Sequence, residues 1–243
     1  MSDYADAALA EIERIRSENE RRSREIPADF YGWNRSWNQF RNFQIQRACL
    51  RELAAQKMFP LANRRVLDIG CGSGAWLLEF AKWGASPRHL FGIDLDSERV
   101  RRADELLPAA QLECGDARRL PWPDESMDIT AQFTVFTSML NADVRDAVAR
   151  EMLRVTKQNG LILWYDFRVD NPSNANVRGI GRAQVRLLFP DCSFRFRQLT
   201  LVPPLARMLV RFSWPLAFIL ESLRFLDTHY LVAIRKNSSQ RAR

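Results

Sequence analysis

The sequence contains few of the residues that build metal and disulfide centres. Its 243 residues include four cysteines and two histidines, and the cysteines show neither a paired pattern nor metal-ligand spacing. We therefore expect no metal site, and free buried thiols in a reducing compartment. His89 and His229 each precede an apolar run, which favours a place at the entrance of a strand over membership of a catalytic pair.

Long hydrophobic runs are also lacking. Within the segment 202–227 the longest uncharged run is nine residues, from 212 to 220, which is too short to cross a bilayer. Residues 2–20 are polar and charged and do not resemble a signal peptide. The sequence therefore predicts a cytoplasmic protein.

Short apolar segments alternate with helical patterns along most of the chain. With 243 residues, 47% of them hydrophobic, the chain can bury a large core. The alternation predicts an α/β fold, with a mostly parallel sheet covered by helices on both faces. Ligands of such sheets bind at the carboxyl ends of the strands.

The run from Val66 to Gly74 is the most informative motif. A buried strand containing Asp68 is followed by Gly70, Gly72 and Gly74. A glycine loop lets the backbone approach a ligand closely. A carboxylate beside the loop would repel a phosphate and attract a positively charged group. The motif therefore favours a cationic, amino-acid-bearing cofactor over a nucleotide phosphate.

Two more apolar segments end in acids. Asp94 follows Gly74 by 20 residues, at an offset where a carboxylate can accept hydrogen bonds from both hydroxyls of a ribose. Asp96 is expected to cap the helix that follows it. Asp116 and Ala117 follow a third short strand, and Asp116 either contacts the cofactor or caps its own turn.

These motifs resemble, in order and spacing, those of class I S-adenosylmethionine-dependent methyltransferases. Within that class the core is similar to the type-11 group of ubiquinone and menaquinone methyltransferases. A strand at 127–133, a helix at 143–156, a turn at 157–160 and a strand ending at Asp166 complete the match. In the turn, Gln158-Asn159-Gly160 stands where the family usually has Pro-Gly-Gly, and Asn159 and Gly160 are expected to adopt left-handed dihedrals.

The resemblance implies a Rossmann-like fold with a seven-stranded, mostly parallel sheet, an N-terminal helical cap and a helical insertion before the last strand. It divides the chain into a cap or lid at 1–60, a cofactor-binding domain at 61–236 with the insertion at 202–227, and a tail at 237–243.

The resemblance also implies roles in binding S-adenosylmethionine, with S-adenosylhomocysteine as the product. Asp94 would bind the ribose, Leu95 would pack on the adenine, and Asp116 with Ala117 would recognise its edge. The predicted cofactor residues are Asp68, Gly70, Cys71, Gly72, Gly74, Asp94, Leu95, Asp116, Ala117 and Phe133.

Two segments are candidates for binding the acceptor. Residues 30–40 contain five aromatic residues; rings there could attract the sulfonium, or they could form a packed stripe. A polar loop follows the strand ending at Asp166, which is a candidate base. Arginines then recur every fourth residue from 178 to 186 and would share one helix face. That face could bind an anionic acceptor or be exposed to solvent. The predicted acceptor residues are Tyr31, Trp33, Asp166, Arg168, Arg178 and Arg182.

Positive charge is concentrated in the C-terminal part. Residues 161–243 hold 13 Lys or Arg and 5 Asp or Glu, and residues 1–160 hold 23 and 24, which gives +8 and −1 and sums to +7. The excess indicates an anionic acceptor or surface, or a solvated basic face. The insertion at 202–227 predicts an amphipathic helix, broken near Pro215, that roofs the acceptor pocket, pairs with another subunit or lies on a membrane.

The predicted activity is transfer of a methyl group to a small-molecule or lipid- or glycan-linked acceptor, with O-methylation favoured. No nucleic-acid partner is expected, because the sequence lacks the Asn-Pro-Pro-Tyr and Pro-Cys motifs of base methylation. Three alternatives remain. They are C-methylation of a quinone-like lipid, a catalytically silent binding protein, and a dinucleotide oxidoreductase using Gly70, Gly72 and Ala75.

Overall fold

The computed structural model describes residues 2–27, 30, 32, 34–171 and 174–237. One seven-stranded sheet forms its centre, in the order β3-β2-β1-β4-β5-β7-β6. All neighbouring strands are parallel except β7, which is antiparallel to both β5 and β6. The strands are β1 (Val66–Ile69), β2 (Leu90–Asp94), β3 (Gln111–Cys114), β4 (Met127–Phe133), β5 (Thr156–Phe167), β6 (Cys192–Leu201) and β7 (Asp227–Lys236). The predicted mostly parallel sheet is confirmed.

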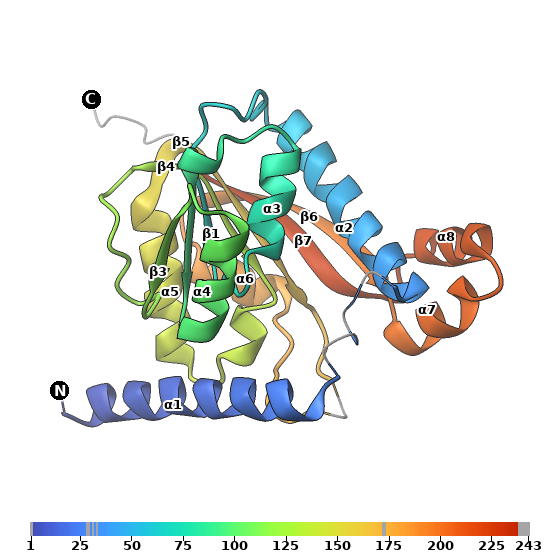
Figure 1. Cartoon of the computed structure of the whole chain (residues 1–243), viewed down its shortest axis with the longest axis horizontal. Helices are drawn as coiled ribbons and strands as arrows, with labels where there is room; N and C mark the ends of the chain where they lie inside the picture. The colour runs from blue at the N-terminus through green and yellow to red at the C-terminus, as the bar shows by residue number, and fades with distance from the viewer. Residues whose placement is uncertain (1, 28–29, 31, 33, 172–173, 238–243) are drawn as a thin grey trace.

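Helices cover both faces of the sheet, as Figure 1 shows. The α-helices of the described part are α1 (Ser2–Glu25), α2 (Ser36–Ala55), α3 (Ala75–Lys82), α4 (Ser97–Leu106), α5 (Ala142–Val155), α6 (Arg182–Leu188), α7 (Pro203–Val210) and α8 (Trp214–Ser222). Short 3-10 turns lie at Pro87–His89 and Phe136–Ser138. Asp96 caps α4 as predicted, since its Oδ1 accepts hydrogen bonds from the backbone amides of Glu98 and Arg99.

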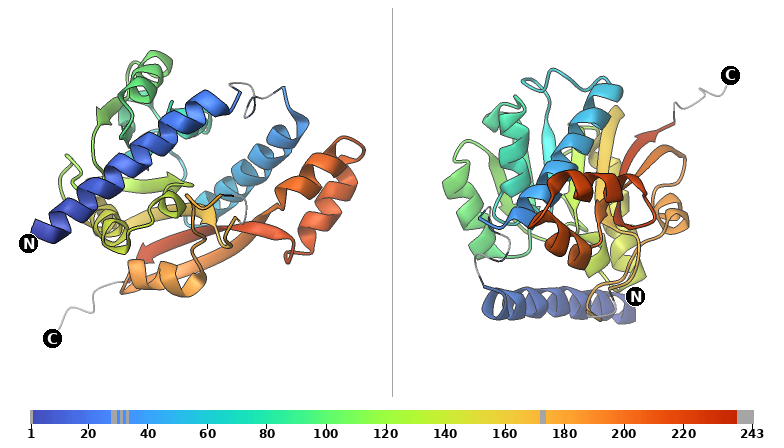
Figure 2. Two further views of the ribbon diagram at one scale, coloured as in Figure 1. Left: turned by 90° about the horizontal axis from the view of Figure 1, so that it is seen from below. Right: turned by 90° about the vertical axis from the view of Figure 1, so that its right-hand side faces the viewer.

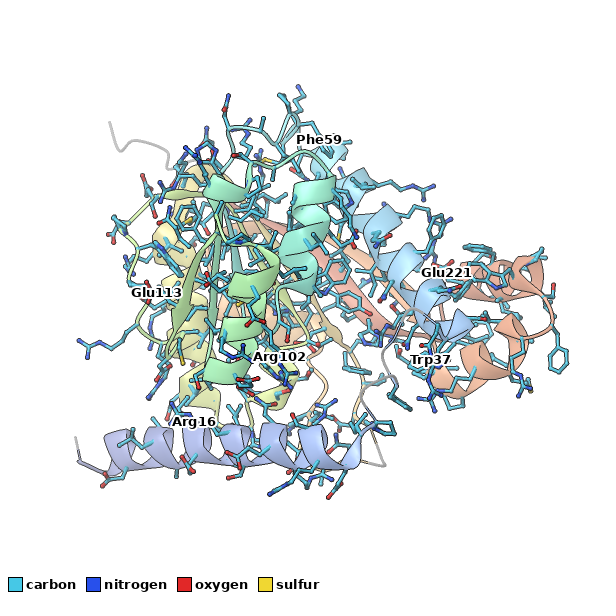
Figure 3. The ribbon with its side chains drawn as sticks, viewed as in Figure 1. Arg16, Trp37, Phe59, Arg102, Glu113 and Glu221 are labelled. Carbon is cyan, nitrogen blue, oxygen red and sulfur yellow. The ribbon has the colours of Figure 1, made fainter. Side chains whose placement is uncertain are left out.

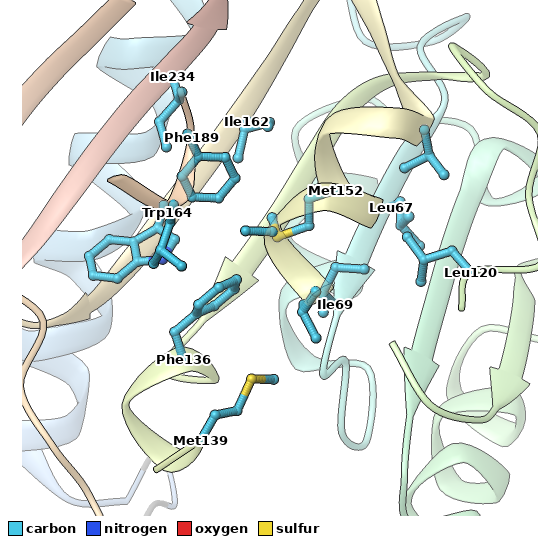
Figure 4. Packing of buried hydrophobic residues seen from close by; sticks show 14 of the residues in the cluster. Leu67, Ile69, Leu120, Phe136, Met139, Met152, Ile162, Trp164, Phe189 and Ile234 are labelled. Carbon is cyan, nitrogen blue, oxygen red and sulfur yellow. The ribbon is translucent and has the colours of Figure 1, made fainter. Parts of the chain in front are cut away.

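The core is divided between the two faces. On one face, α5 and α6 pack on the sheet around Met152, Trp164 and Phe189, which are fully buried (Figure 4). On the other face, α2 and α3 pack around Leu53 and Phe80. Strands β1, β2 and β4 are buried along their whole length, as expected of a sheet covered on both faces.

The cap helix α1 crosses the carboxyl ends of the strands beneath α4 and α5 (Figures 1 and 2). Glu11, which is only 7% exposed, holds α1 in this position. Its carboxylate accepts hydrogen bonds from the backbone amides of Leu140 and Asn141 and pairs with Arg14. The Arg14 guanidinium in turn donates to the carbonyl of Ser138. The cap therefore closes directly over the loop that follows β4.

The predicted insertion between the last two strands is a pair of short helices, α7 and α8, which project beyond the sheet at one end (Figures 1 and 2). The break falls at residues 211–213, where Ser213 caps α8 by accepting a hydrogen bond from the amide of Leu216. Pro215 lies in the first turn of α8, where its missing N–H costs nothing. We call this pair the α7–α8 hairpin.

The expectation for the turn at 157–160 is wrong in detail. These residues belong to β5, but the register with β4 jumps from Thr156 opposite Met127 to Leu161 opposite Ile129. The intervening residues bulge out beside Asp128, whose carboxylate accepts a hydrogen bond from Lys157 Nζ at 2.9 Å. Neither Asn159 nor Gly160 has a positive φ, because the bulge rather than a tight turn supplies the extra length.

Candidate functional site

A single cavity of about 2070 Å³ lies at the carboxyl ends of β1, β2, β4 and β5. The glycine loop and the ends of β2 and β3 line one part of it, and α1 covers it. The beginning of α2, the ends of β5 and β6 and the start of α7 line another part. The position agrees with the ligand sites of open α/β sheets, which lie outside the carboxyl edge.

The glycine loop has the backbone conformation that the motif requires. Gly70, Gly72 and Gly74 have φ angles of 68°, 53° and 80°, which side chains rarely tolerate. At Gly70 a Cβ atom would also lie 2.5 Å from Val135 Cγ2, whereas at Gly72 it would meet nothing within 4 Å. Gly70 therefore permits close packing against the loop after β4, and Gly72 leaves open space above its own backbone.

Asp94 is fixed at the end of β2. One carboxylate oxygen accepts a hydrogen bond from Gly72 N at 2.9 Å and the other accepts one from Asp96 N at 3.0 Å. The residue is 8% exposed and lines the cavity. Both oxygens retain lone pairs that could accept further hydrogen bonds. The backbone thus holds this carboxylate in one orientation before any ligand arrives.

Asp68 lies behind the glycine loop rather than in the cavity wall. It is 2% exposed, and its Oδ1 has no hydrogen-bond partner within the described part of the chain. Burial, reinforced by the charge of Asp94, raises the pKa of the Asp68 carboxyl well above its usual value. A buried acceptor without a partner is costly, so a cationic or hydrogen-bonding ligand at this edge would relieve it. Burial also raises the pKa of the neighbouring Cys71 thiol, which lines the cavity.

Asp116 and Ala117 line the cavity beyond β3 together with Leu95. Asp116 Oδ1 accepts a hydrogen bond from Arg118 N at 2.9 Å, and its Oδ2 pairs with the Arg118 guanidinium at 2.6 Å. Asp116 therefore does cap its own turn, which was one of the two expectations. The same carboxylate also faces the cavity, with oxygen lone pairs left for a ligand.

Phe133, at the end of β4, lies 8% exposed in the cavity wall. Its ring stacks on Trp76 of α3, with centroids 4.0 Å apart and planes 11° from parallel. This pair forms an aromatic wall between the glycine loop and Tyr165 of β5, whose ring centroid lies 6.2 Å from that of Phe133.

A polar cluster that the sequence did not indicate lies in the part of the cavity lined by β5, β6 and α2. Tyr165 Oη lies 2.8 Å from Thr200 Oγ1, and the Tyr165 ring stacks on His229 at 4.8 Å and 4°. Gln44 of α2 is 2% exposed and lines the same cavity, yet neither atom of its amide has a hydrogen-bond partner among the described residues. A buried, unpaired amide in a cavity wall indicates a polar ligand group.

His229 is the third residue of β7, two residues inside the strand rather than at its predicted entrance, and it also lines the cavity. It is 3% exposed, and burial, with the charge of Arg41, lowers the pKa of its imidazole to about 3. The Thr228 hydroxyl lies 3.1 Å from the carbonyl of Thr200 and 2.9 Å from His229 Nδ1. Because this hydroxyl has one proton and donates it to the carbonyl, it accepts from Nδ1–H, which leaves a lone pair on Nε2.

Asp166 is completely buried and does not line the cavity. Its carboxylate accepts hydrogen bonds from Thr137 Oγ1 and Thr137 N at 2.5 and 3.1 Å, and from Phe167 N at 3.0 Å. It therefore ties the loop after β4 to β5. A base that touches an acceptor in the cavity would need an accessible oxygen, which Asp166 lacks.

The predicted arginine face does not form. Arg178 precedes α6, whose first residue is Arg182, so only Arg182 and Arg186 share a helix. Both guanidinium groups lie 5.3 Å from the ring centroid of Phe196 on β6. Arg168 donates a hydrogen bond to the carbonyl of Asp227 at 2.7 Å. None of these four arginines lines the cavity.

Tyr31 and Trp33 lie outside the described residues. Of the other aromatic residues of that segment, Phe30, Trp37 and Phe40 line the cavity. Phe40 is fully buried against Phe218 of α8 at 4.9 Å, as expected for a packed stripe. Figure 3 shows Trp37 beside α7, where the Arg207 guanidinium lies 4.7 Å from its ring centroid.

Among the residues that the structure describes, no three His, Cys, Asp or Glu side chains form a group that could hold a metal ion. None of the helices in the described part of the chain is long and apolar enough to span a membrane.

Residues 66–160 match the family model of a methyltransferase domain. Over 130 residues the chain is 31% identical to malonyl-[acyl-carrier protein] O-methyltransferase of Erwinia billingiae, covering 52% of this chain and 49% of the relative. It is 31% identical over 142 residues to demethylmenaquinone methyltransferase of Lactobacillus johnsonii, covering 56% of each. The chain thus spans about half the length of these curated relatives.

The fold has a counterpart in a solved structure of Haemonchus contortus phosphoethanolamine N-methyltransferase 1 in complex with phosphoethanolamine and S-adenosylhomocysteine. The TM-score is 0.62 at 14% identity, over 97% of this chain and 51% of that one. The matched family model and the curated relatives agree with the resemblance found in the sequence. Residues 66–160 match a methyltransferase domain, and the solved structure shares the fold of this chain.

Proposed function

We propose that this protein transfers a methyl group from S-adenosylmethionine to a hydroxyl group of a small-molecule or lipid-linked acceptor. One observation carries the proposal. A single cavity joins the glycine loop and Asp94 to a buried, neutral His229 whose Nε2 has a free lone pair. A donor held by the first group can therefore meet an acceptor held by the second.

The cofactor end suits S-adenosylmethionine part by part. The fixed Asp94 carboxylate would accept hydrogen bonds from the ribose hydroxyls. Leu95 would pack on the adenine, while Asp116 would accept from its amine and Ala117 N would donate to its ring. The open space above Gly72 would admit the amino-acid part, whose ammonium would favour the ionised form of Asp68. When bound, S-adenosylmethionine supplies an electrophilic methyl group carried on a sulfonium.

At the acceptor end, we propose that His229 Nε2 accepts the proton of the acceptor hydroxyl. A histidine with a pKa of about 3 is neutral at neutral pH, so the lone pair is available. The hydroxyl becomes strongly acidic only as its oxygen bonds to the methyl carbon, and at that stage even a weak base accepts its proton. The Thr228 contact with Nδ1 orients the ring. This proton transfer favours O-methylation over C-methylation.

Other groups of the cavity suit a polar acceptor. The unpaired amide of Gln44 would donate to and accept from the acceptor. Arg41 lines the same cavity and affects the titration of His229, so an anionic group of the acceptor would be favoured near it. Asp166 would act by positioning the loop after β4, since it accepts hydrogen bonds from Thr137 and Phe167 and does not line the cavity.

The first test is calorimetry with S-adenosylmethionine, S-adenosylhomocysteine and NAD. We expect the first two to bind and NAD not to bind; binding of NAD alone would overturn the proposal in favour of an oxidoreductase. The second test offers methyl-labelled donor with a panel of hydroxyl acceptors and, in parallel, a demethylated quinone. Labelling of the quinone ring carbon, with none of the hydroxyls labelled, would establish C-methylation instead.

A further inference from the structure

The α7–α8 hairpin exposes a surface that the proposed chemistry does not use. Twelve residues between 202 and 227 are exposed, and six of them are large and apolar. These are Met208 at 54%, Phe212 at 84%, Leu216 at 44%, Ile219 at 61%, Leu223 at 46% and Phe225 at 69%. Exposed apolar patches of this kind mark interaction sites on otherwise ordinary surfaces.

The opposite face of the hairpin is firmly packed, so the exposure is not a sign of a loose element. Ala206, Val210 and Ala217 are buried in a cluster with Phe40 of α2. Glu221, which Figure 3 shows on α8 near α2, is 5% exposed and pairs with Arg47 at 3.3 Å. The hairpin is therefore held on the body by one face and presents the other outward.

The outward surface carries charge of one sign. The exposed charged residues of the segment 202–227 are Arg207, Arg211 and Arg224; Arg207 also lines the cavity, and Arg224 lies 3.6 Å from the Asp227 carboxylate. The acids of the segment, Glu221 and Asp227, are both buried, at 5% and 1%. A positive surface without exposed carboxylates is complementary to an anionic partner.

This charge pattern favours a lipid surface over a second copy of the chain as the partner of the hairpin. In a symmetric dimer the patch would meet itself and bring the arginines of both copies together without a carboxylate between them. An anionic bilayer satisfies both properties at once, because apolar side chains enter the acyl region while arginines face the headgroups.

The hairpin also forms part of the cavity wall. Val202, Pro203, Ala206 and Arg207 line the cavity at the start of α7. Contact between the hairpin and a bilayer would therefore place the acceptor part of the cavity beside the lipid.

We propose that the α7–α8 hairpin docks on an anionic lipid surface and presents the cavity to an acceptor carried in that surface; the second half of this statement rests on the proposed function. The hairpin does not cross the bilayer, since α7 and α8 have 8 and 9 residues. Docking is peripheral and depends on both apolar contact and charge.

The test is co-sedimentation of the whole chain with vesicles of phosphatidylcholine alone and of phosphatidylcholine mixed with phosphatidylglycerol. We expect binding to the anionic vesicles only, weakened by salt. Arg211→Ser should reduce vesicle affinity about fivefold. The double substitution Phe212→Ser with Ile219→Ser should reduce it at least about tenfold. Matched controls are Leu187→Ser on α6, where Leu187 is 80% exposed, and Arg150→Ser, where Arg150 is exposed on α5.

Three results would overturn docking: no binding to either vesicle, equal binding of the hairpin variants and the wild type, or a dimer in sedimentation velocity that the double substitution dissociates without any vesicle binding. Calorimetry with S-adenosylmethionine on the same preparations separates the two proposals. Cofactor binding without vesicle binding overturns docking alone, and vesicle binding without cofactor binding overturns the proposed function alone.

Discussion

Two buried carboxyl groups lie at neighbouring strand ends beside the proposed cofactor part of the cavity. Asp94 is held by two backbone amides, whereas Asp68 has an oxygen without a partner among the described residues. Burial, together with the charge of Asp94, favours a neutral Asp68 in the free protein. A bound ammonium would reverse this preference, because an opposite charge stabilises the ionised form. Asp94 would thus recognise the ribose of the cofactor, and Asp68 would respond to its amino-acid part.

The first prediction concerns Asp94→Asn. An asparagine cannot accept from both Gly72 N and Asp96 N while also accepting from a ribose diol, because one of its two terminal atoms is a donor. We expect calorimetry to show S-adenosylmethionine affinity weaker by about 2 kcal/mol. Asp96→Asn is the matched control, since asparagine also caps helices. The affinity of this variant for S-adenosylmethionine should stay within about twofold of that of the wild type. Unchanged affinity in Asp94→Asn would refute the ribose assignment.

The second prediction concerns His229→Gln, which keeps a polar group of similar size but removes the imidazole. We expect kcat for methyl transfer to a hydroxyl acceptor to fall by about 10²- to 10⁴-fold. The dissociation constant of S-adenosylmethionine should not change, because the predicted cofactor residues belong to other elements. Thr228→Val should have a smaller effect on kcat, since it removes only the contact that orients Nδ1. Full activity of His229→Gln would exclude His229 as the base.

Most of the proposed cofactor residues line one cavity, and the sequence could indicate this because they lie at or just after the ends of strands within short motifs. Gln44, Tyr165 and His229 could not be predicted in this way. They come from α2, β5 and β7, and the antiparallel pairing that places Phe167 opposite His229 joins residues 62 positions apart. Spacing also misled for the arginines from 178 to 186, because a period of four indicates a helix but does not say where the helix begins.

At the scale of elements, the cap helix α1 forms one side of the cavity wall. Ile12 and Ile15 line the cavity from α1, and the helix is fixed to the loop after β4 chiefly by Glu11 and Arg14. The sequence predicted an N-terminal cap from the family resemblance. It did not indicate Glu11 as its anchor, because the backbone amides that Glu11 reaches lie about 130 positions away.

The third prediction concerns Glu11→Ala. The substitution leaves the amides of Leu140 and Asn141 without their partner and releases Arg14, at a cost of about 2 kcal/mol to the closed position of α1. Limited proteolysis should then cleave α1 faster, and S-adenosylmethionine should dissociate faster in stopped-flow measurements. Glu13→Ala is the matched control, because Glu13 is exposed on the same helix. Equal behaviour of the two variants would show that Glu11 does not secure the cap.

At the scale of the whole molecule, buried titratable groups give opposing dependences of stability on pH. Burial raises the pKa of Asp166 to about 7. Its contribution to the free energy of unfolding is therefore fully present below the pKa of the unfolded chain, near 3.9, and is lost as pH rises through about 7. Burial lowers the pKa of His229 to about 3. The contribution of His229 to the free energy of unfolding is present above the pKa of the unfolded chain, near 6.5, and is lost as pH falls towards 3. Between about pH 4 and 6.5 the two effects partly cancel.

The fourth prediction separates these two effects by urea unfolding at pH 5 and pH 7. Between these values the wild type binds a proton at His229 only on unfolding, so acidification destabilises it relative to His229→Gln by about 2 kcal/mol. The matched variant Asp166→Asn should change in the opposite direction. The wild type keeps its Asp166 proton when folded and releases it on unfolding, so acidification from pH 7 to pH 5 stabilises it relative to Asp166→Asn by about 2 kcal/mol. Differences of the same sign for the two variants would mean that burial does not control both titrations, and no difference for His229→Gln would mean that water reaches the imidazole through the cavity.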